Sequence, residues 1–162
     1  MSVPGPDIFR IRGHRVKKVF HLVYISEAYE QICYSDIQNI LESSKANNLK
    51  NDLSGLLIYK DHHFIQILEG DESAVIKTMG RIIQDRRNHH VRVIIESLSN
   101  QRIFENWAMA FHDGDINPSA SDVVIKIFET ALDQNKKEKE SLLQLLQCFR
   151  RSAPLFKEDS IS

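Results

Sequence analysis

Apolar residues gather in five short segments between residues 19 and 111, and each segment has the length and the β-branched or aromatic content of a strand. The five segments are Val19–Ile25, Leu53–Tyr59, Phe64–Leu68, Val91–Ser97 and Phe104–Phe111. The connection between the second segment and the third contains Lys60-Asp61-His62, which is short and polar and predicts a hairpin. Both alternating faces of the third segment are apolar, so that strand should be central in the sheet and covered on both sides.

Helical spacing predicts one helix after the first strand and another after the third. The first should begin at Ser35, because Ser35 and Gln38 have the form of a capping box. It should end near Asn47-Asn48, because asparagine tolerates the left-handed backbone of helix ends. Gly70-Asp71 opens the second helix. Its expected buried stripe consists of Val75, Met79, Ile82 and Ile83.

The order of these elements predicts an α+β fold, with a ferredoxin-like βαββαβ core and one additional strand. Two amphipathic stripes follow the boundary that Asn117-Pro118 marks, and they predict C-terminal helices packed on the sheet. The stripes consist of Val124, Ile127, Phe128 and Ala131, and of Leu142, Leu145, Leu146 and Phe149. The charged segment Gln134–Lys139 lacks Gly and Pro, so one long helix remains an alternative to the two that we expect.

The chain should therefore have four parts: a flexible N-terminal arm at 1–17, a core domain at 18–113, a helical extension at 118–152 and a tail at 153–162. The arm is punctuated by proline and glycine and is locally basic. We interpret it as a solvated tail in preference to an anion or partner site.

The composition narrows the class of protein. With 162 residues, 42% of them hydrophobic, the chain can bury a core. A formal net charge of −1 argues against a dedicated nucleic-acid binder. Its two cysteines are too few for a disulfide framework, and no apolar run approaches the roughly 20 residues that span a bilayer. We therefore expect a cytoplasmic protein that binds neither nucleic acid nor membrane.

Two polar side chains stand where the pattern predicts a core. Gln66 lies in the central strand, and an unpaired buried amide costs about 1–3 kcal/mol. Tyr24 ends an apolar strand, and its hydroxyl also needs a partner. The two could satisfy each other across neighbouring strands, either as a structural pair or as the floor of a pocket for a planar ligand. Trp107, Met109 and Phe111 alternate along the last strand, as core or as ligand lining.

Other chemistry finds less support. The pairs His62-His63 and His89-His90 invite a metal site, but adjacent residues on a strand point to opposite faces. We therefore place both pairs in surface loops and expect no metal site. No serine or cysteine stands in a recognisable grouping with a base, and no glycine-rich phosphate loop occurs.

From Lys18 to His112 the chain resembles the BLUF family, whose members sense blue light using flavin. The motifs that carry the resemblance occur in the family's order. They are Leu22-Val-Tyr24 with Ser26, Asn47-Asn48, Leu53-Ser-Gly-Leu-Leu57, Phe64-Ile-Gln66, Leu68-Glu-Gly70, Ile82-Ile83 with Asp85, Arg102 with Phe104, and Trp107-Ala-Met109. The ordered set is specific, although each motif alone is weak.

The resemblance implies a non-covalently bound flavin between the two helices, FAD in the first place, with FMN or riboflavin as alternatives. The implied flavin-binding residues are Tyr24, Asn47, Asn48, Phe64, Gln66, Arg81 and Asp85. The implied photoactive residues are Tyr24, Gln66, Trp107 and Met109. The stretch Asp85–His90 is one residue longer than the family's usual form, so Arg87 and His89 receive no flavin-binding role.

The resemblance also implies the switch. The excited flavin takes an electron and then a proton from Tyr24, and recombination leaves the Gln66 amide rotated or tautomerised, which shifts the flavin absorption to the red. No net chemistry occurs, so we expect a stand-alone photoreceptor and not an enzyme. Its signal should pass by contact, through self-association or to a separate downstream protein. The main alternative is a flavin-free ferredoxin-like interaction module, and a flavoenzyme is a second one.

Overall fold

A computed structural model of the chain describes residues 17–115, 121–133 and 136–151. Nearly all of the expected N-terminal arm, the boundary at Asn117-Pro118 and the tail at 153–162 lie outside the described residues. Among the described residues, no helix is both long enough and apolar enough to cross a bilayer.

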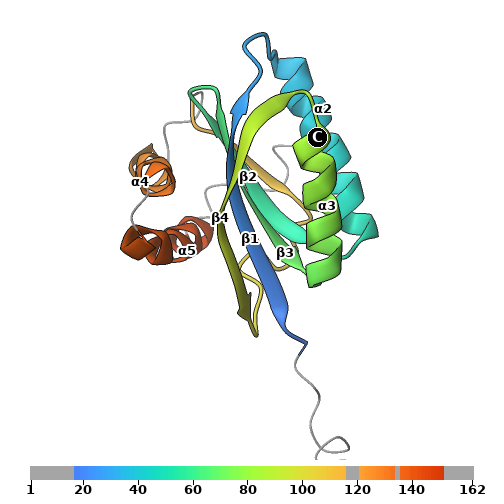
Figure 1. Cartoon of the computed structure of the whole chain (residues 1–162), viewed down its shortest axis with the longest axis vertical. Helices are drawn as coiled ribbons and strands as arrows, with labels where there is room; N and C mark the ends of the chain where they lie inside the picture. Colours follow the sequence, from blue (N-terminus) through green and yellow to red (C-terminus); the bar gives the residue numbers. More distant parts are fainter. Residues whose placement is uncertain (1–16, 116–120, 134–135, 152–162) are drawn as a thin grey trace, which may run out of the picture.

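The described strands form one mixed five-stranded sheet in the order β4-β1-β3-β2-β5, which confirms the ferredoxin-like core with an additional strand (Figure 1). The strands are β1 (Val19–Ala28), β2 (Ser54–Lys60), β3 (His63–Gly70), β4 (Asn88–Ser99) and β5 (Ala110–Asp113). Neighbouring strands are antiparallel, except that β5 runs parallel to β2. In the split βαβ order each helical crossover passes over one strand position. A strand of opposite direction fills that position, so neighbouring strands of the core are antiparallel.

β2 and β3 form the predicted hairpin and the middle of the sheet. Asp61 and His62 at the turn both have positive φ, as the tightest hairpin turns require. Along β2, a side chain at Gly55 would collide with the carbonyl oxygen of Ile67, since a Cβ there would lie 2.0 Å from that oxygen. Glycine therefore permits the close pairing of β2 with β3 at this point.

Helices α2 (Tyr34–Lys50) and α3 (Glu72–Gln84) cover one face of the sheet (Figure 1). The start of α2 corrects the expected cap, because the carboxylate of Asp36 accepts a hydrogen bond from the Cys33 backbone N–H at 3.0 Å. The box thus lies two residues earlier than Ser35 and Gln38. The end is corrected too, since the left-handed residue is Asp52.

The stripe expected on α3 is partly wrong. Val75 and Met79 are buried as predicted, but Ile83 is 59% exposed and Thr78 is buried in its place. The helix turns its Thr78 side toward α2, where the hydroxyl finds a polar partner (below). A polar pocket between the helices therefore decides which side of α3 faces inward.

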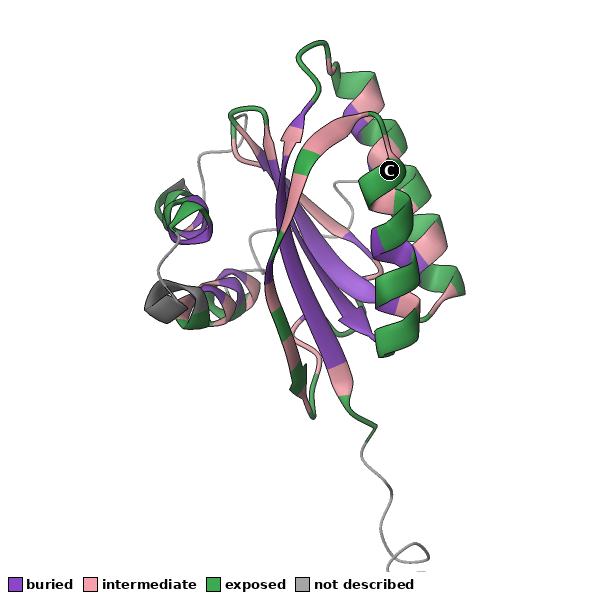
Figure 2. Cartoon of the chain, in the orientation of Figure 1, coloured by how far each residue is buried: buried purple, intermediate pink, exposed green. Residues whose placement is uncertain are grey.

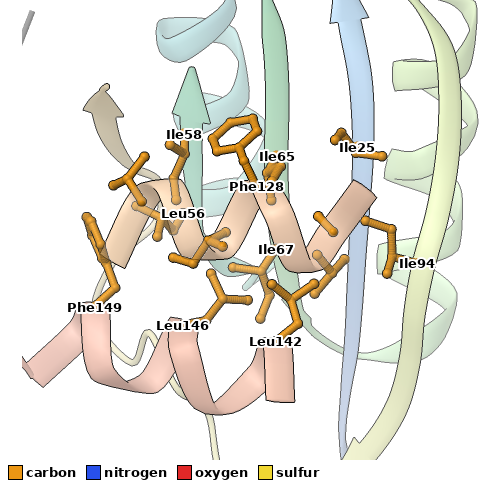
Figure 3. Close-up of a cluster of buried hydrophobic side chains, with 14 of the residues drawn as sticks. Ile25, Leu56, Ile58, Ile65, Ile67, Ile94, Phe128, Leu142, Leu146 and Phe149 are labelled. Atoms are coloured by element: carbon orange, nitrogen blue, oxygen red, sulfur yellow. The ribbon is translucent and has the colours of Figure 1, made fainter. Parts of the chain in front are cut away.

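Two C-terminal helices, α4 (Ser121–Leu132) and α5 (Lys136–Arg151), cover the opposite face, and the two expected helices are confirmed. Figure 2 shows the buried strands lying between the two pairs of helices. Side chains of α4 and α5 meet the isoleucine-rich face of the sheet in one apolar cluster (Figure 3). Its fully buried helical members include Ile127, Leu142 and Leu146. The central strands are thus covered on both sides, as their apolar faces require.

The last strand differs most from expectation. Residues predicted to begin it at Phe104 form an irregular segment, and β5 starts only at Ala110. The buried carboxylate of Glu69 accepts hydrogen bonds from the backbone N–H groups of Ile103 and Phe104 at 2.6 and 2.7 Å. These two amides bond to a side chain instead of a neighbouring strand, so the backbone at Ile103 and Phe104 does not pair as a strand.

Candidate functional site

A cavity of about 260 Å³ lies between α2, α3 and the sheet. Its size is near the lower end of small-molecule pockets, which span roughly 300–1,000 Å³. The lining residues are Tyr24, Ser26, Ile40, Ser43, Ser44, Asn47, Asn48, Leu57, Phe64, Gln66, Thr78, Arg81, Ile82, Asp85, Arg87 and Asn88. All seven residues expected to bind a flavin are among them, so the fold brings together a set that spans 62 positions of sequence, from Tyr24 to Asp85.

The floor of the cavity is a tyrosine–glutamine pair. Tyr24 and Gln66 are direct cross-strand partners in the β1–β3 ladder, and both are almost fully buried. The tyrosine hydroxyl donates a hydrogen bond to Oε1 of Gln66. The amide nitrogen of Gln66 then faces the sulfur of Met109 at 3.6 Å, which is a weak acceptor. One end of the amide is held firmly, while the other could exchange its partner at little cost.

Burial also sets the ionisation of Tyr24. Desolvation raises the pKa of its hydroxyl far above the ordinary value of about 10, and the nearby Asp85 carboxylate raises it further. The hydroxyl is therefore neutral at any physiological pH. Its proton leaves only if the ring first loses an electron, because oxidation of a phenol makes its O–H strongly acidic.

Asn47 and Asn48, near the end of α2, make hydrogen bonds to different parts of the fold. Asn48 is buried and donates to the carbonyl of Ala108 at 2.6 Å, which anchors the segment before β5. Asn47 donates to the hydroxyl of Thr78 at 3.1 Å and accepts from Arg81 at 2.7 Å. These two bonds tie α2 to α3 across the cavity and hold the Arg81 guanidinium at its edge.

Arg87 is a lining residue to which the sequence assigned no role. Its guanidinium makes a two-pronged contact with Asp85, with Nε–Oδ1 and Nη2–Oδ2 distances of 2.9 and 2.6 Å. This contact lowers the pKa of Asp85, chiefly through the hydrogen bonds from Arg87. The extra residue in the stretch from Asp85 to His90 made the position ambiguous in sequence, and only the folded turn shows which arginine faces the cavity.

Two buried polar atoms beside the cavity have no hydrogen-bond partner among the described residues, Oγ of Ser26 and Oδ1 of Asn88. A buried polar atom without a partner is costly, so such atoms point to a ligand or water that completes them. Together with Gln66 and Asn47 they offer donors and acceptors on a narrow site walled by Ile40 and Ile82. A flat heterocycle with polar edges, such as the ring system of a flavin, fits this set.

Trp107 and Met109 take opposite sides, which corrects the expectation that they alternate on one strand face. Met109 belongs to the cluster beneath α2 and α3, beside Gln66. Trp107 belongs to the cluster beneath α4 and α5, where the Arg150 guanidinium lies 4.1 Å from its ring centre. The irregular backbone before β5 does not follow the period of a strand, so two residues that are both odd-numbered diverge. Of the four expected photoactive residues, Tyr24 and Gln66 line the cavity, while Met109 reaches it only through Gln66 and Trp107 lies across the sheet.

Comparison with known proteins agrees with this geometry. A family model described as BLUF, sensors of blue-light using FAD, matches residues 19–110. The photoactivated adenylate cyclase subunit alpha of Euglena gracilis is 30% identical over 83 residues, which cover 51% of this chain and 8% of that protein. The blue light- and temperature-regulated antirepressor BluF of Escherichia coli (strain K12) is 25% identical over 108 residues, covering 67% of this chain and 27% of that protein.

A solved structure described as BlrB, a BLUF protein in its dark state, superposes with a TM-score of 0.71. It is 23% identical, and the match covers 85% of this chain and 98% of that one. At this identity the likeness shows the fold. The chain spans only a small part of the two curated relatives. The activities in their names are therefore properties of those proteins.

Proposed function

Since the chain belongs to the BLUF family of blue-light sensors, we propose that light switches its hydrogen-bond network through Tyr24 and Gln66 and that the new state signals to a partner protein. The matched domain is a flavin-binding light sensor and not an enzyme, as expected from the sequence. The single observation that supports the switch is the buried hydrogen bond from Tyr24 to Gln66 at the floor of the cavity.

The bound flavin supplies light absorption and, once excited, a strong oxidant. Tyr24 is the donor, because its ring lines the cavity and its neutral hydroxyl already points along a hydrogen bond. Gln66 relays the proton, because its amide accepts from Tyr24 at one end and faces only a thioether at the other. Rotation or tautomerisation of this amide exchanges a donor for an acceptor within the cavity.

FAD is the flavin that we propose, with FMN and riboflavin as the alternatives. The family description names FAD. In this chain Arg81 and Arg87 supply two guanidinium groups at the cavity, and guanidinium binds phosphate oxygens well. Riboflavin has no phosphate for these guanidinium groups to bind.

The signal leaves through the segment before β5. Met109 touches the Gln66 amide on one side of the sheet, and Trp107 touches Arg150 of α5 on the other. Met109 and Trp107 lie within three residues of chain. A change at Gln66 that displaces Met109 therefore also affects the contact of Trp107 with the C-terminal helices. We propose that these helices carry the output, by self-association or by binding a separate downstream protein, in the cytoplasm.

The test is the spectrum of the full chain loaded with flavin, before and after blue light. A reversible red shift of the flavin absorption is the expected result. A protein that stays colourless after loading would instead support a flavin-free interaction module. Turnover with a nicotinamide substrate would identify a flavoenzyme.

A further inference from the structure

We propose that Glu27, His63, His89 and His90 form a binding site for one divalent transition-metal ion, with Zn²⁺ as the ion that best suits the ligand atoms. The site lies where β1, β3 and β4 meet the β2–β3 turn, and its residues take no part in the flavin cavity. It is independent of the proposed photoreceptor function.

The distances suit a metal ion. Oε2 of Glu27 lies 3.3 Å from Nε2 of His89 and 3.1 Å from Nδ1 of His90. One ligand atom from each of the three residues lies within 4.8 Å of the others. A tetrahedral zinc ion with bonds of about 2.0–2.1 Å has ligand atoms about 3.3–3.4 Å apart. The three atoms therefore need only small side-chain rotations to bind one ion.

The strand register offers His63 as a candidate for the fourth ligand. Glu27 pairs directly with His63 on β3 and with His89 on β4. Direct cross-strand partners in antiparallel strands point to the same face, with Cβ atoms about 4.5–5.5 Å apart. His63, Glu27 and His89 thus form one row across three strands.

The imidazole of His63 is already oriented as metal ligands usually are. Its Nδ1 lies 2.7 Å from the carbonyl oxygen of Asp61, which can only accept, so Nδ1 carries the proton. Nε2 is then left with its lone pair available. Metal-bound histidines commonly donate their second ring nitrogen to a backbone carbonyl in this way.

His90 joins the cluster because the backbone breaks the strand rule. The β1–β4 ladder shifts register between Ile25 and Glu27, and His90 adopts a φ of 52°. The bulge turns the His90 ring to the side of His89, so that the ring centres lie 4.5 Å apart. Alternation along a regular strand excluded a metal site in the sequence, and this irregularity removes the objection.

The surroundings favour a cation. The adjoining hollow is lined by Glu27, Ala28, Glu30, His62, His63 and His89, with two carboxylates and no lysine or arginine. Exposed histidine–carboxylate contacts alone add little to the stability of a fold. A left-handed backbone at a non-glycine residue is strained. Metal ligation offsets that strain, and imidazole with carboxylate is a ligand set that zinc accepts.

The experiment titrates Zn²⁺ into the full chain, purified without a histidine tag and freed of metal by a chelator. Calorimetry should show one strong site, and thermal unfolding should shift upward with added Zn²⁺, because the ion binds only the folded arrangement. Glu27→Gln and His89→Gln should each weaken binding about tenfold or more, since even indirect partners of metal ligands alter affinity by about 10–100-fold.

Glu96→Gln is the matched control, because it removes the same charge from an exposed position of β4 outside the cluster and should leave Zn²⁺ affinity unchanged. Should a ligand variant fail to fold, His90→Asn provides the test, because asparagine tolerates the left-handed backbone. Absence of binding to the unaltered chain overturns the proposal. So does a Zn²⁺ affinity that is the same in both ligand variants as in the unaltered chain, which would locate the ion elsewhere in the chain.

Discussion

Tyr24 and Gln66 lie directly opposite each other in the β1–β3 ladder, and the tyrosine hydroxyl donates to the glutamine carbonyl oxygen at the floor of the cavity. The sheet register places the two side chains opposite each other. Their alignment therefore follows from the pairing of β1 with β3.

The first prediction removes each partner of that pair in turn. Tyr24→Phe deletes only the hydroxyl, and Gln66→Leu replaces the amide at similar volume, so both variants should fold and bind flavin. Neither should show the reversible red shift, because one lacks the proton donor and the other lacks the amide that rearranges. Absorption spectra before and after blue light measure this.

Trp107→Phe is the control for these two variants, because Trp107 packs on the opposite face of the sheet. It should retain the red shift and alter only the rate or yield of the photocycle. A normal red shift in Tyr24→Phe would contradict the mechanism. Loss of flavin from both cavity variants would mean that Tyr24 and Gln66 only help to bind the flavin.

The second prediction concerns alkaline pH. Burial raises the pKa of Tyr24 in the folded protein, while the unfolded chain should titrate near the ordinary value of about 10. The stabilisation from the neutral hydroxyl is thus fully present below about pH 10 and is lost as the pH rises toward the folded value. The tyrosinate absorbance of the native chain and of Tyr24→Phe should coincide near pH 10. A difference between folded samples at that pH would show that Tyr24 titrates normally.

The third prediction tests the link between α2 and α3. Asn47→Ala removes the partner of both Thr78 and Arg81, so the Arg81 guanidinium loses its anchor at the cavity. Flavin affinity should fall by up to about tenfold, as expected for net hydrogen-bond energies of roughly 0.5–1.5 kcal/mol. Fluorescence titration with flavin measures it. Asn39→Ala, at an exposed position of the same helix, should bind flavin normally.

The fourth prediction concerns the C-terminal helices. Leu146 of α5 is fully buried against the sheet, so Leu146→Ala should lower the free energy of unfolding by about 2–5 kcal/mol. Leu132→Ala at a half-exposed site of α4 should change it by no more than about 0.5 kcal/mol. Urea unfolding distinguishes the two. Equal, small effects would mean that α5 does not depend on this packing.

Much of the fold could be predicted because its signals are local. The strand period of two and the helix period of 3.6 follow from backbone geometry, so the order of elements and the two-sided burial of β3 were evident. The error in the last strand occurred because a polar partner far along the chain decides the backbone there. Glu69 holds Ile103 and Phe104 out of the sheet, and no local pattern near Phe104 reveals a carboxylate 35 positions away.

The candidate site divides in the same way. Residue type and motif order pointed to Tyr24 and Gln66, because a phenol and an amide in an apolar strand need each other or a ligand. Which arginine faces the cavity depended on the turn after α3, where Arg87 clasps Asp85. A one-residue difference in turn length rotates every following side chain, so a sequence with an ambiguous turn leaves such assignments open.

By itself the sequence determined which elements form, which strand is central and which two polar groups lie in the core. Only the tertiary structure decided that Trp107 and Met109 face opposite sides and that His89 and His90 face the same one. The physical reason is common to both cases. Side-chain direction follows sequence position only while the backbone keeps a regular period, and the bulge between β1 and β4 and the irregular segment before β5 both break that period.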